Sequence, residues 1–182
     1  MRAVLDANVL FPFTLRDTLL RAAAEGCFQV YWSEQILEEA TRNLVAAEVM
    51  TARQAERLRA VMEQAFPEAM VRGYERLIGA MRNDEKDRHV AAAAVKAKAD
   101  VIVTSNVRDF RQLPEGTEAQ RPDEFLCGLL DASPEPIIRV LREQAADLRR
   151  PPMTVEDVLA RLQRVAPRFV AQVRVELGSG ER

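Results

Sequence analysis

Short apolar runs separated by long amphipathic stretches constrain the fold of this chain more than any other feature. Residues 1–10, 28–32 and 101–104 are apolar and rich in branched or aromatic side chains, and each is expected to form a strand. Between them, apolar residues recur at helical spacing, and Ser33 and Thr51 stand where helix N-caps are expected. Strands that are joined through helices favour a parallel sheet with helical crossovers over a helical bundle. The expected fold class is therefore α/β.

A boundary is expected near residue 131, where the segment 132–136 contains two prolines and resembles a short linker. Three helical stretches follow it, at residues 137–148, 154–165 and 167–177. We expect a sheet domain at 1–131 and an all-helical C-terminal extension at 132–182. The apolar residues of this extension exceed what three short helices bury alone, which predicts that it supports a partner or a dimer.

Composition excludes several classes of protein. The chain has 182 residues, of which 48% are hydrophobic and 30% charged, as in ordinary soluble globular proteins. No apolar stretch approaches the roughly 20 residues of a membrane span, and we expect no signal peptide before the first strand. Cys27 and Cys127 lack the spacing of metal ligands and are expected to be reduced core residues. We expect a cytoplasmic protein with no membrane contact.

Asp6 is a charged residue in a segment that should be a buried strand. Residues two apart on a strand share a face, so Asp6 and Asn8 are expected to point the same way. A lone buried carboxylate costs several kcal/mol unless a cation or hydrogen bonds meet it, and ligands gather at the carboxyl ends of parallel strands. The alternative is an ordinary turn in which Asp6, Asn8 and Pro12 mark the exit of the strand. This segment alone leaves both interpretations open.

Three further acids occupy positions that could face the same pocket. Glu39 lies beside the buried stripe of its helix, Asp87 shares a face with apolar residues near a helix start, and Asp109 follows the strand at 101–104. Each has an ordinary alternative. Glu39 could be a solvated flank of its helix, Asp87 could form a capping box with Asp84, and Asp109 could be a turn residue.

These acids need a cation if they share one pocket. Several carboxylates cannot all be ionised in one site without a positive charge beside them. Oxygen ligands without a histidine or cysteine cluster favour Mg²⁺ or Mn²⁺ over zinc. His89, two residues after Asp87 on the expected helix, is predicted to face away from the pocket.

Four segments in order resemble the motifs of one family. Residues 5–10 (LDANVL), 33–39 (SEQILEE), 84–90 (DEKDRHV) and 101–110 (VIVTSNVRDF) resemble the motifs of the PIN-domain nucleases. The resemblance is strongest to toxins of the VapC type that have a helical C-terminal extension. It implies a PIN-like parallel β-sheet flanked by helices over residues 1–131.

The resemblance also implies an activity and a set of site residues. Asp6, Glu39, Asp87 and Asp109 would be the catalytic, metal-binding acids, with Asn8, Thr104 and Asn106 as polar supports of the site. The protein would be a Mg²⁺- or Mn²⁺-dependent endoribonuclease that leaves 5′-phosphate and 3′-hydroxyl ends. It would be the toxin of a type II toxin–antitoxin pair, with an RNA substrate such as transfer RNA, a cognate antitoxin and a homodimeric state.

Asn106 departs from the family pattern, because many members carry an aspartate there. An asparagine offers a carbonyl oxygen but no negative charge, which leaves the number of bound metals open. Asp109 would then supply the charge from three residues later. Asn106 also supports the alternative function, a catalytically degenerate PIN-like module that binds RNA or a partner protein.

Overall fold

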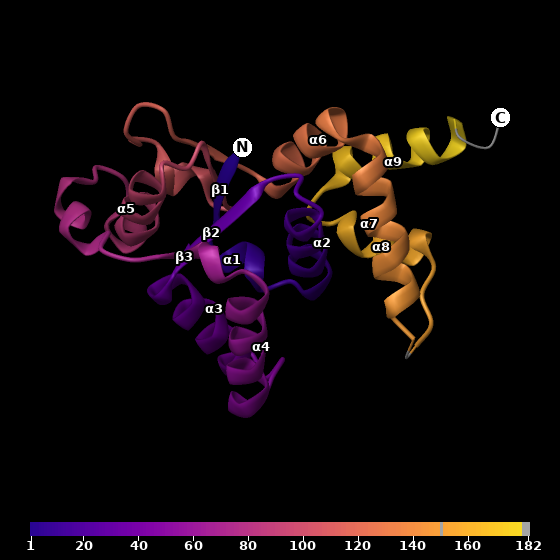
Figure 1. Cartoon of the computed structure of the whole chain (residues 1–182), viewed down its shortest axis with the longest axis horizontal. Helices are drawn as coiled ribbons and strands as arrows, with labels where there is room; N and C mark the ends of the chain where they lie inside the picture. The colour runs from indigo at the N-terminus through magenta and orange to yellow at the C-terminus, as the bar shows by residue number, and fades with distance from the viewer. Residues whose placement is uncertain (150, 180–182) are drawn as a thin grey trace. The chain divides into compact units, whose positions relative to one another are not determined.

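The computed structural model, drawn in Figure 1, describes residues 1–149 and 151–179. These residues contain a five-stranded sheet. The strands are β1 (Arg2–Leu5), β2 (Gln29–Ser33), β3 (Met70–Val71), β4 (Val101–Val103) and β5 (Glu118–Gln120). Their order is β3-β2-β1-β4-β5, and every neighbouring pair is parallel. In the register, Val4 of β1 pairs with Tyr31 on one side and Ile102 on the other. The expected α/β fold with a parallel sheet is confirmed.

Nine α-helices are assigned in the described part of the chain. They are α1 (Ala7–Leu10), α2 (Phe13–Ala24), α3 (Glu34–Ala46), α4 (Ala52–Ala65), α5 (Arg88–Ala97), α6 (Pro122–Ala132), α7 (Pro134–Asp147), α8 (Val155–Leu162) and α9 (Pro167–Ser179). Four short 3₁₀ turns are η1 (Pro67–Ala69), η2 (Glu75–Ala80), η3 (Glu85–Asp87) and η4 (Val107–Phe110). The expected caps are confirmed, because the Ser33 side chain accepts from Ile36 N–H and Thr51 forms a capping box with Gln54. None of the described helices is both long and apolar enough to cross a bilayer.

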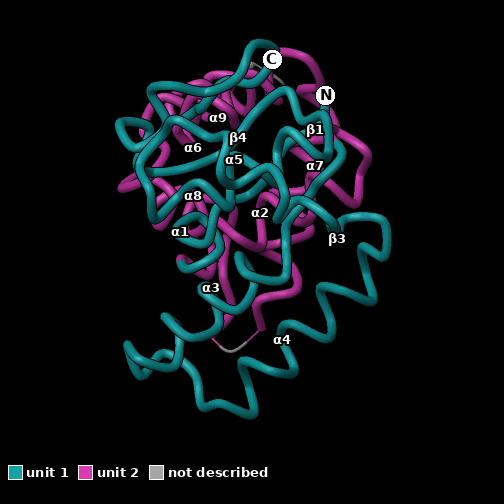
Figure 2. Tube along the Cα trace, turned by 90° about the vertical axis from the view of Figure 1, so that its left-hand side faces the viewer, with its two compact units in different colours: residues 1–11, 29–120 teal, residues 12–28, 121–182 magenta. Residues whose placement is uncertain are grey.

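The chain packs as two compact units, drawn in different colours in Figure 2. Unit 1 comprises residues 1–11 and 29–120 and contains the whole sheet, with α5 packed against β1, β2 and β4. Unit 2 comprises residues 12–28 and 121–182, where α2 packs on α7 and α8, and α6 packs on α9. The expected domains 1–131 and 132–182 stay a prediction. The compact units divide the chain differently, because α2 and α6 pack with the C-terminal helices.

The first strand is shorter than expected. It ends at Leu5, and residues 7–10 form the helix α1 with Asp6 as its extended N-cap residue. Asp6 and Asn8 are therefore not on one strand face, and the prediction that they share one was wrong. β3 and β5 were not predicted, because edge strands of two and three residues are too short for a periodic pattern.

Most apolar residues of the C-terminal helices are buried within unit 2. Ile137, Val140 and Leu141 of α7 and Val158 and Leu159 of α8 are all fully inaccessible to solvent. The three C-terminal helices do not bury these residues alone, because α2 and α6 supply surfaces that cover them. These residues therefore do not by themselves require a partner or a dimer.

Candidate functional site

Asp6 is a buried carboxylate held by two hydrogen bonds at the carboxyl end of β1. Its side chain is 4% exposed, and its Oδ2 accepts from Thr104 Oγ1 at 2.7 Å and from Asn8 Nδ2 at 2.5 Å. Its backbone N–H donates to the carbonyl of Val103 at 3.1 Å, which joins it to the end of β4. The hydrogen bonds explain how this charged side chain is tolerated inside the fold.

Asn8 and Thr104 tie the loop after β4 to the start of α1. Thr104 is fully buried and also accepts from Asn8 Nδ2 at 3.0 Å, while Asn8 Oδ1 accepts from the N–H of Ser105 at 2.9 Å. The N–H of Asn106 donates to Thr104 Oγ1 at 3.0 Å. Asn106 thus contacts this network through its backbone, and as a residue it is exposed.

Asp87 and Asp109 meet at the side chain of Lys86. Lys86 Nζ lies 3.0 Å from Asp109 Oδ2 and 4.0 Å from Asp87 Oδ2. Asp87 Oδ2 is inaccessible to solvent and accepts no hydrogen bond from the residues that the structure describes. The structure therefore brings these two predicted acids to one cation and leaves a buried acceptor oxygen unsatisfied.

Glu39 contacts His89, which was expected to face away. His89 is buried, and its Nε2 lies 3.6 Å from Glu39 Oε2. That expectation was wrong because it counted helical rotation from Asp87, whereas Asp87 ends the 3₁₀ turn η3 and only caps α5. Burial lowers the pKa of His89 despite the opposing charge of Glu39, which favours the neutral ring.

Burial and mutual charge raise the pKa of two of these acids. Burial raises the pKa of Asp6, and the Glu39 carboxylate adds to this, while the hydrogen bonds from Thr104 and Asn8 oppose it. Burial also raises the pKa of Asp87 to about 7, with further increases from the charges of Asp6 and Asp109 that Lys86 partly offsets. The charge of Glu39 therefore affects the pKa of Asp6, and the charges of Asp6 and Asp109 affect the pKa of Asp87. The four predicted acids thus form one electrostatic cluster.

The acids lie at a switch point of the sheet. From β1 the chain adds β2 and β3 on one side, and β4 and β5 then join the other side. Asp6 follows β1 and Thr104 follows β4, so the two neighbouring strands deliver them to the same edge. In open α/β sheets, ligands bind in the crevice that forms at such a point.

Comparison with known proteins identifies the family. A family model described as "PIN domain" matches residues 2–108, which is more than half of the chain. The chain belongs to the PIN-domain family. A second model, described as "VapC50 C-terminal domain", matches residues 122–175. The resemblance of the sequence to PIN-domain toxins with a helical C-terminal extension is thereby confirmed.

One curated relative matches over more than half of the chain. The chain is 40% identical over 111 residues to a protein of Mycobacterium tuberculosis named "Putative ribonuclease VapC50". This match covers 59% of the present chain and 66% of that protein, which is slightly less than two thirds of the relative's length. No solved structure matches the chain.

The donor set of this PIN domain suits a hard divalent cation. Its acids offer carboxylate oxygens, the ligands that Mg²⁺ and Mn²⁺ prefer, and the buried Asp87 Oδ2 has no hydrogen-bond donor. A cation beside Asp6 and Asp87 would also relieve the charge repulsion that raises their pKa values. Within residues 1–149 and 151–179, no three His, Cys, Asp or Glu side chains already converge closely enough to hold a metal. The acids therefore fit the ion in chemistry, and binding would have to draw them closer together.

Lys86 and His89 are the site residues that sequence reasoning missed. A signal for Lys86 was present, because this chain has three lysines and one of them lies inside the acidic run 84–87. No comparable signal marked His89, since its contact with Glu39 depends on how α3 and α5 are placed in the fold.

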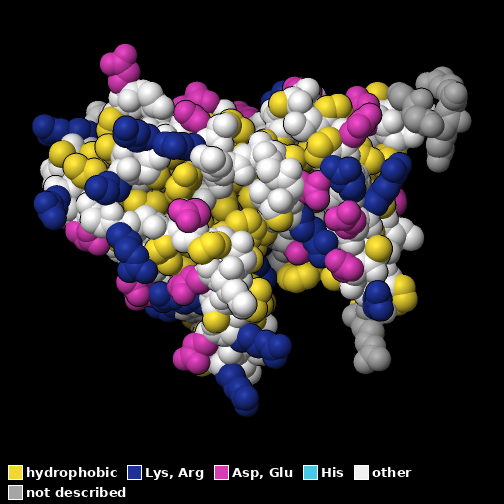
Figure 3. Space-filling view, viewed as in Figure 1, with side chains coloured by type: hydrophobic (Ala, Val, Ile, Leu, Met, Phe, Trp, Pro, Cys, Tyr) yellow, Lys and Arg dark blue, Asp and Glu magenta, His cyan; other side chains and the backbone are white. Residues whose placement is uncertain are grey.

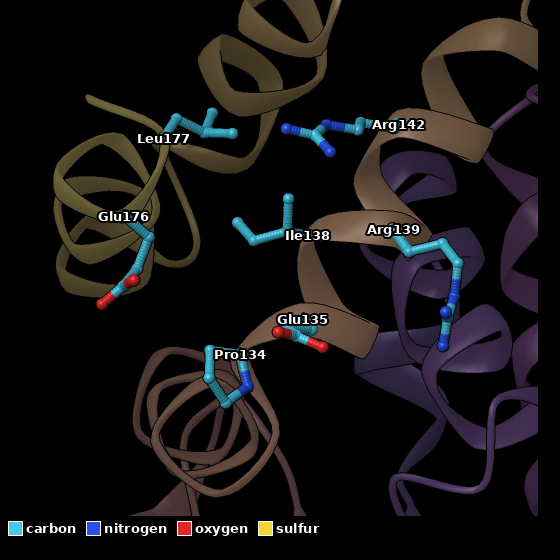
Figure 4. A pocket seen from close by; sticks show the side chains of 7 residues that line it. All are labelled: Pro134, Glu135, Ile138, Arg139, Arg142, Glu176 and Leu177. Carbon is cyan, nitrogen blue, oxygen red and sulfur yellow. The ribbon is translucent and has the colours of Figure 1, made fainter. Parts of the chain in front are cut away.

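A groove between α7 and α9 contains none of the predicted site residues. Its volume is ≈ 860 Å³, and its lining comprises Pro134, Glu135, Ile138, Arg139, Arg142, Glu176 and Leu177 (Figure 4). Arg142 reaches across the groove over Ile138, whereas Arg139 points away from it and pairs with Glu25 at 2.8 Å. This groove is a polar-rimmed surface with a small apolar floor, and it is distinct in composition from the acidic cluster.

Proposed function

We propose that this protein is a metal-dependent endoribonuclease and the toxin of a type II toxin–antitoxin pair, acting in the cytoplasm. The observation that carries the proposal is the pair Asp6, which is buried, and Asp87, which is partly buried with an inaccessible Oδ2. Both carboxylates have raised pKa values, and Asp6 lies at the ligand-binding edge of a PIN-domain sheet. The name of the curated relative, a ribonuclease, supports the same activity.

Each acid has a proposed role in this reaction. Asp6, Glu39, Asp87 and Asp109 hold Mg²⁺ or Mn²⁺, and Asn8 and Thr104 fix the orientation of Asp6 through their hydrogen bonds. When bound, the ion polarises the scissile phosphate and lowers the pKa of a water molecule. In-line attack of that water leaves 5′-phosphate and 3′-hydroxyl ends.

Basic residues near the acids suit the phosphates of an RNA substrate. Arg82, Arg108 and Arg111 are exposed and lie on the two loops that carry Asp87 and Asp109. In Figure 3, Lys and Arg side chains gather around α5 on the left of the view, with acidic side chains among them. Arginine recognises phosphate oxygens through a planar set of donors. The proposed substrate is RNA that is cleaved in single-stranded loops, including those of transfer RNA.

The proposed partners are a cognate antitoxin and a second copy of the chain. The groove between α7 and α9 offers an apolar floor at Ile138 and Leu177 with Arg142 and Glu176 at its rim (Figure 4). Such a surface suits an amphipathic helix that presents apolar residues flanked by opposite charges.

Incubation of the purified, antitoxin-free protein with total RNA tests the proposal. Cleavage is expected with millimolar Mg²⁺ or Mn²⁺ and is expected to stop when EDTA is added. Sequencing of the fragment ends should find 5′-phosphates. An Asp6→Asn protein prepared in parallel controls for contaminating ribonucleases.

A degenerate PIN-like module that binds RNA or a partner protein is the second candidate. Asn106 favours it, because an exposed amide supplies no charge to a metal site. RNA binding without cleavage under every metal condition would support this candidate, whereas metal-dependent cleavage would exclude it.

A further inference from the structure

Lys86 places a positive charge between two of the acids that we assign to metal binding. Its Nζ is 3.0 Å from Asp109 Oδ2 and 4.0 Å from Asp87 Oδ2. We propose that Lys86 is a built-in counter-cation that competes with the divalent metal ion for Asp87 and Asp109, and so sets the metal concentration at which the site fills. The proposal rests on the proposed function, because it requires these acids to bind a divalent cation.

The backbone around Lys86 keeps its side chain close to both acids. Lys86 lies in the turn η3, where its N–H donates to Asp84 Oδ1 at 3.2 Å. The N–H of Asp84 in turn donates to the carbonyl oxygen of Asp109 at 2.9 Å. The turn that carries Lys86 and Asp87 is thus hydrogen-bonded to the turn that carries Asp109, and the ammonium group lies within 4.0 Å of both carboxylates.

Without a metal ion, the acids need such a counter-charge. Asp87 Oδ2 is buried and accepts no hydrogen bond, and Asp87 lies in the field of Asp6 and Asp109. An ammonium group within 4.0 Å offsets part of this repulsion.

Lys86 is also able to leave when a metal ion arrives. Its side chain is 64% exposed and ends a flexible four-carbon stem, so its ammonium group can return to water at little cost. A divalent cation has twice the charge and coordinates carboxylate oxygens directly, which favours the exchange. Lys86 therefore opposes metal binding at low metal concentration without preventing it.

Isothermal titration of Mn²⁺ into the full-length, antitoxin-free protein tests this role. Lys86→Gln and a second neutral variant, Lys86→Met, should bind Mn²⁺ about two- to fivefold more tightly than wild type, the range expected for an exposed ion pair. Lys86→Arg, which keeps the charge, should bind like wild type. Lys96→Gln removes an exposed lysine farther along the same segment and serves as the matched control. The increase in Mn²⁺ affinity of the two neutral Lys86 variants should become smaller as NaCl rises from about 0.05 M to about 0.5 M, because salt screens exposed charges.

The outcomes separate this proposal from the proposed function. If wild type binds Mn²⁺ and cleaves RNA while both neutral Lys86 variants bind Mn²⁺ equally or more weakly, Lys86 is not a competing cation and the nuclease assignment stands. An equal gain in Lys96→Gln would also overturn the role of Lys86, since it would show an effect of net charge alone. If wild type binds no Mn²⁺ at all, both proposals are wrong.

Discussion

The backbone N–H of Asp84 donates a 2.9 Å hydrogen bond to the carbonyl oxygen of Asp109, although 25 residues separate them in the chain. This bond joins the turn before α5 to the turn after β4. Asp87 lies three residues after its donor, and Asp109 itself is the acceptor. The loops that carry the two acids are therefore joined directly, and we expect a change in either loop to affect both acids.

Asp6→Asn is expected to abolish RNA cleavage, lowering its rate by at least about 100-fold, because the substitution removes a charged metal ligand. The amide oxygen can still accept the hydrogen bonds of Asn8 and Thr104, so the fold should persist. Loss of one of several crowded charges should leave the melting temperature equal to or above that of wild type. Cleavage assays and thermal denaturation of the two purified proteins measure both effects.

Glu38→Gln is the matched control for that experiment. Glu38 is exposed on α3 beside Glu39, so its substitution should change neither cleavage nor melting temperature. An Asp6→Asn protein that is unfolded where wild type is native would show that Asp6 serves folding instead.

Mn²⁺ should stabilise the wild-type fold by mass action. At millimolar concentration, the ion is expected to raise the melting temperature by a few degrees, because it binds the folded site and not the unfolded chain. Neither Asp6→Asn nor Asp87→Asn should show this rise. Differential scanning calorimetry with and without Mn²⁺ provides the measurement, and equal rises in all three proteins would place the ion elsewhere.

The metal-free protein should lose stability as pH rises from about 4 to about 7 through the ionisation of Asp87. Burial, followed by the charge of Asp6, raises the pKa of Asp87 from its ordinary value of 3.8 to about 7. Between these values the folded state holds a proton that the unfolded chain has released, so raising the pH favours unfolding. In urea denaturation with EDTA, the free energy of unfolding should fall less between these pH values for Asp87→Asn than for wild type. An identical pH dependence in both proteins would mean that Asp87 ionises normally in the fold.

The departure at Asn106 gives a paired prediction. If Asp109 supplies the charge of the fourth acid, Asp109→Asn should lose most of the cleavage activity, while Asn106→Asp should retain it and bind Mn²⁺ at least as tightly as wild type. Cleavage assays and Mn²⁺ titration of both variants test this. The reverse pattern, with normal cleavage by Asp109→Asn and none by Asn106→Ala, would make Asn106 the ligand and Asp109 a turn residue.

Substitutions in the groove between α7 and α9 should weaken antitoxin binding without affecting RNA cleavage. Ile138→Asp places a charge on the apolar floor, and Arg142→Glu reverses a rim charge, so each should lower affinity for the antitoxin at least about tenfold. Lys98→Gln lies outside this groove and should bind normally. Unchanged affinity in both groove variants, measured by titration calorimetry, would exclude this surface. Removal of residues 132–182 is a poorer test, because it would uncover the apolar faces of α2 and α6.

The central strands and the positions of polar residues after them were predictable, because each is marked by a short, continuous sequence pattern. Strands β2 and β4 are short apolar runs, Ser33 and Thr51 are effective caps, and polar residues follow β1 and β4 directly. The resemblance to PIN-domain proteins was carried by four contiguous segments, which a sequence displays without any knowledge of packing.

The remaining features depend on contacts between distant segments. The pairing of Glu39 with His89 requires α3 and α5 to be placed in three dimensions, and the pairing of Lys86 with Asp109 requires two loops to meet. The packing of α2 with the C-terminal helices joins residues more than 100 positions apart, and it includes a buried hydrogen bond in which Thr18 donates to Gln144 at 2.8 Å. Periodicity reports which face of a helix is buried, but not which segment covers it.

The discontinuous membership of unit 2 has a consequence for how the chain is made. The ribosome makes α2 early in translation, whereas its partners α7 and α8 are made more than a hundred residues later. Until then, Leu15 and Leu19, which are buried in the finished protein, lack the helices that cover them in their own unit. A product that terminates near residue 120 would contain every candidate acid together with an uncovered apolar helix. Such a fragment is a natural substrate for chaperones and proteases.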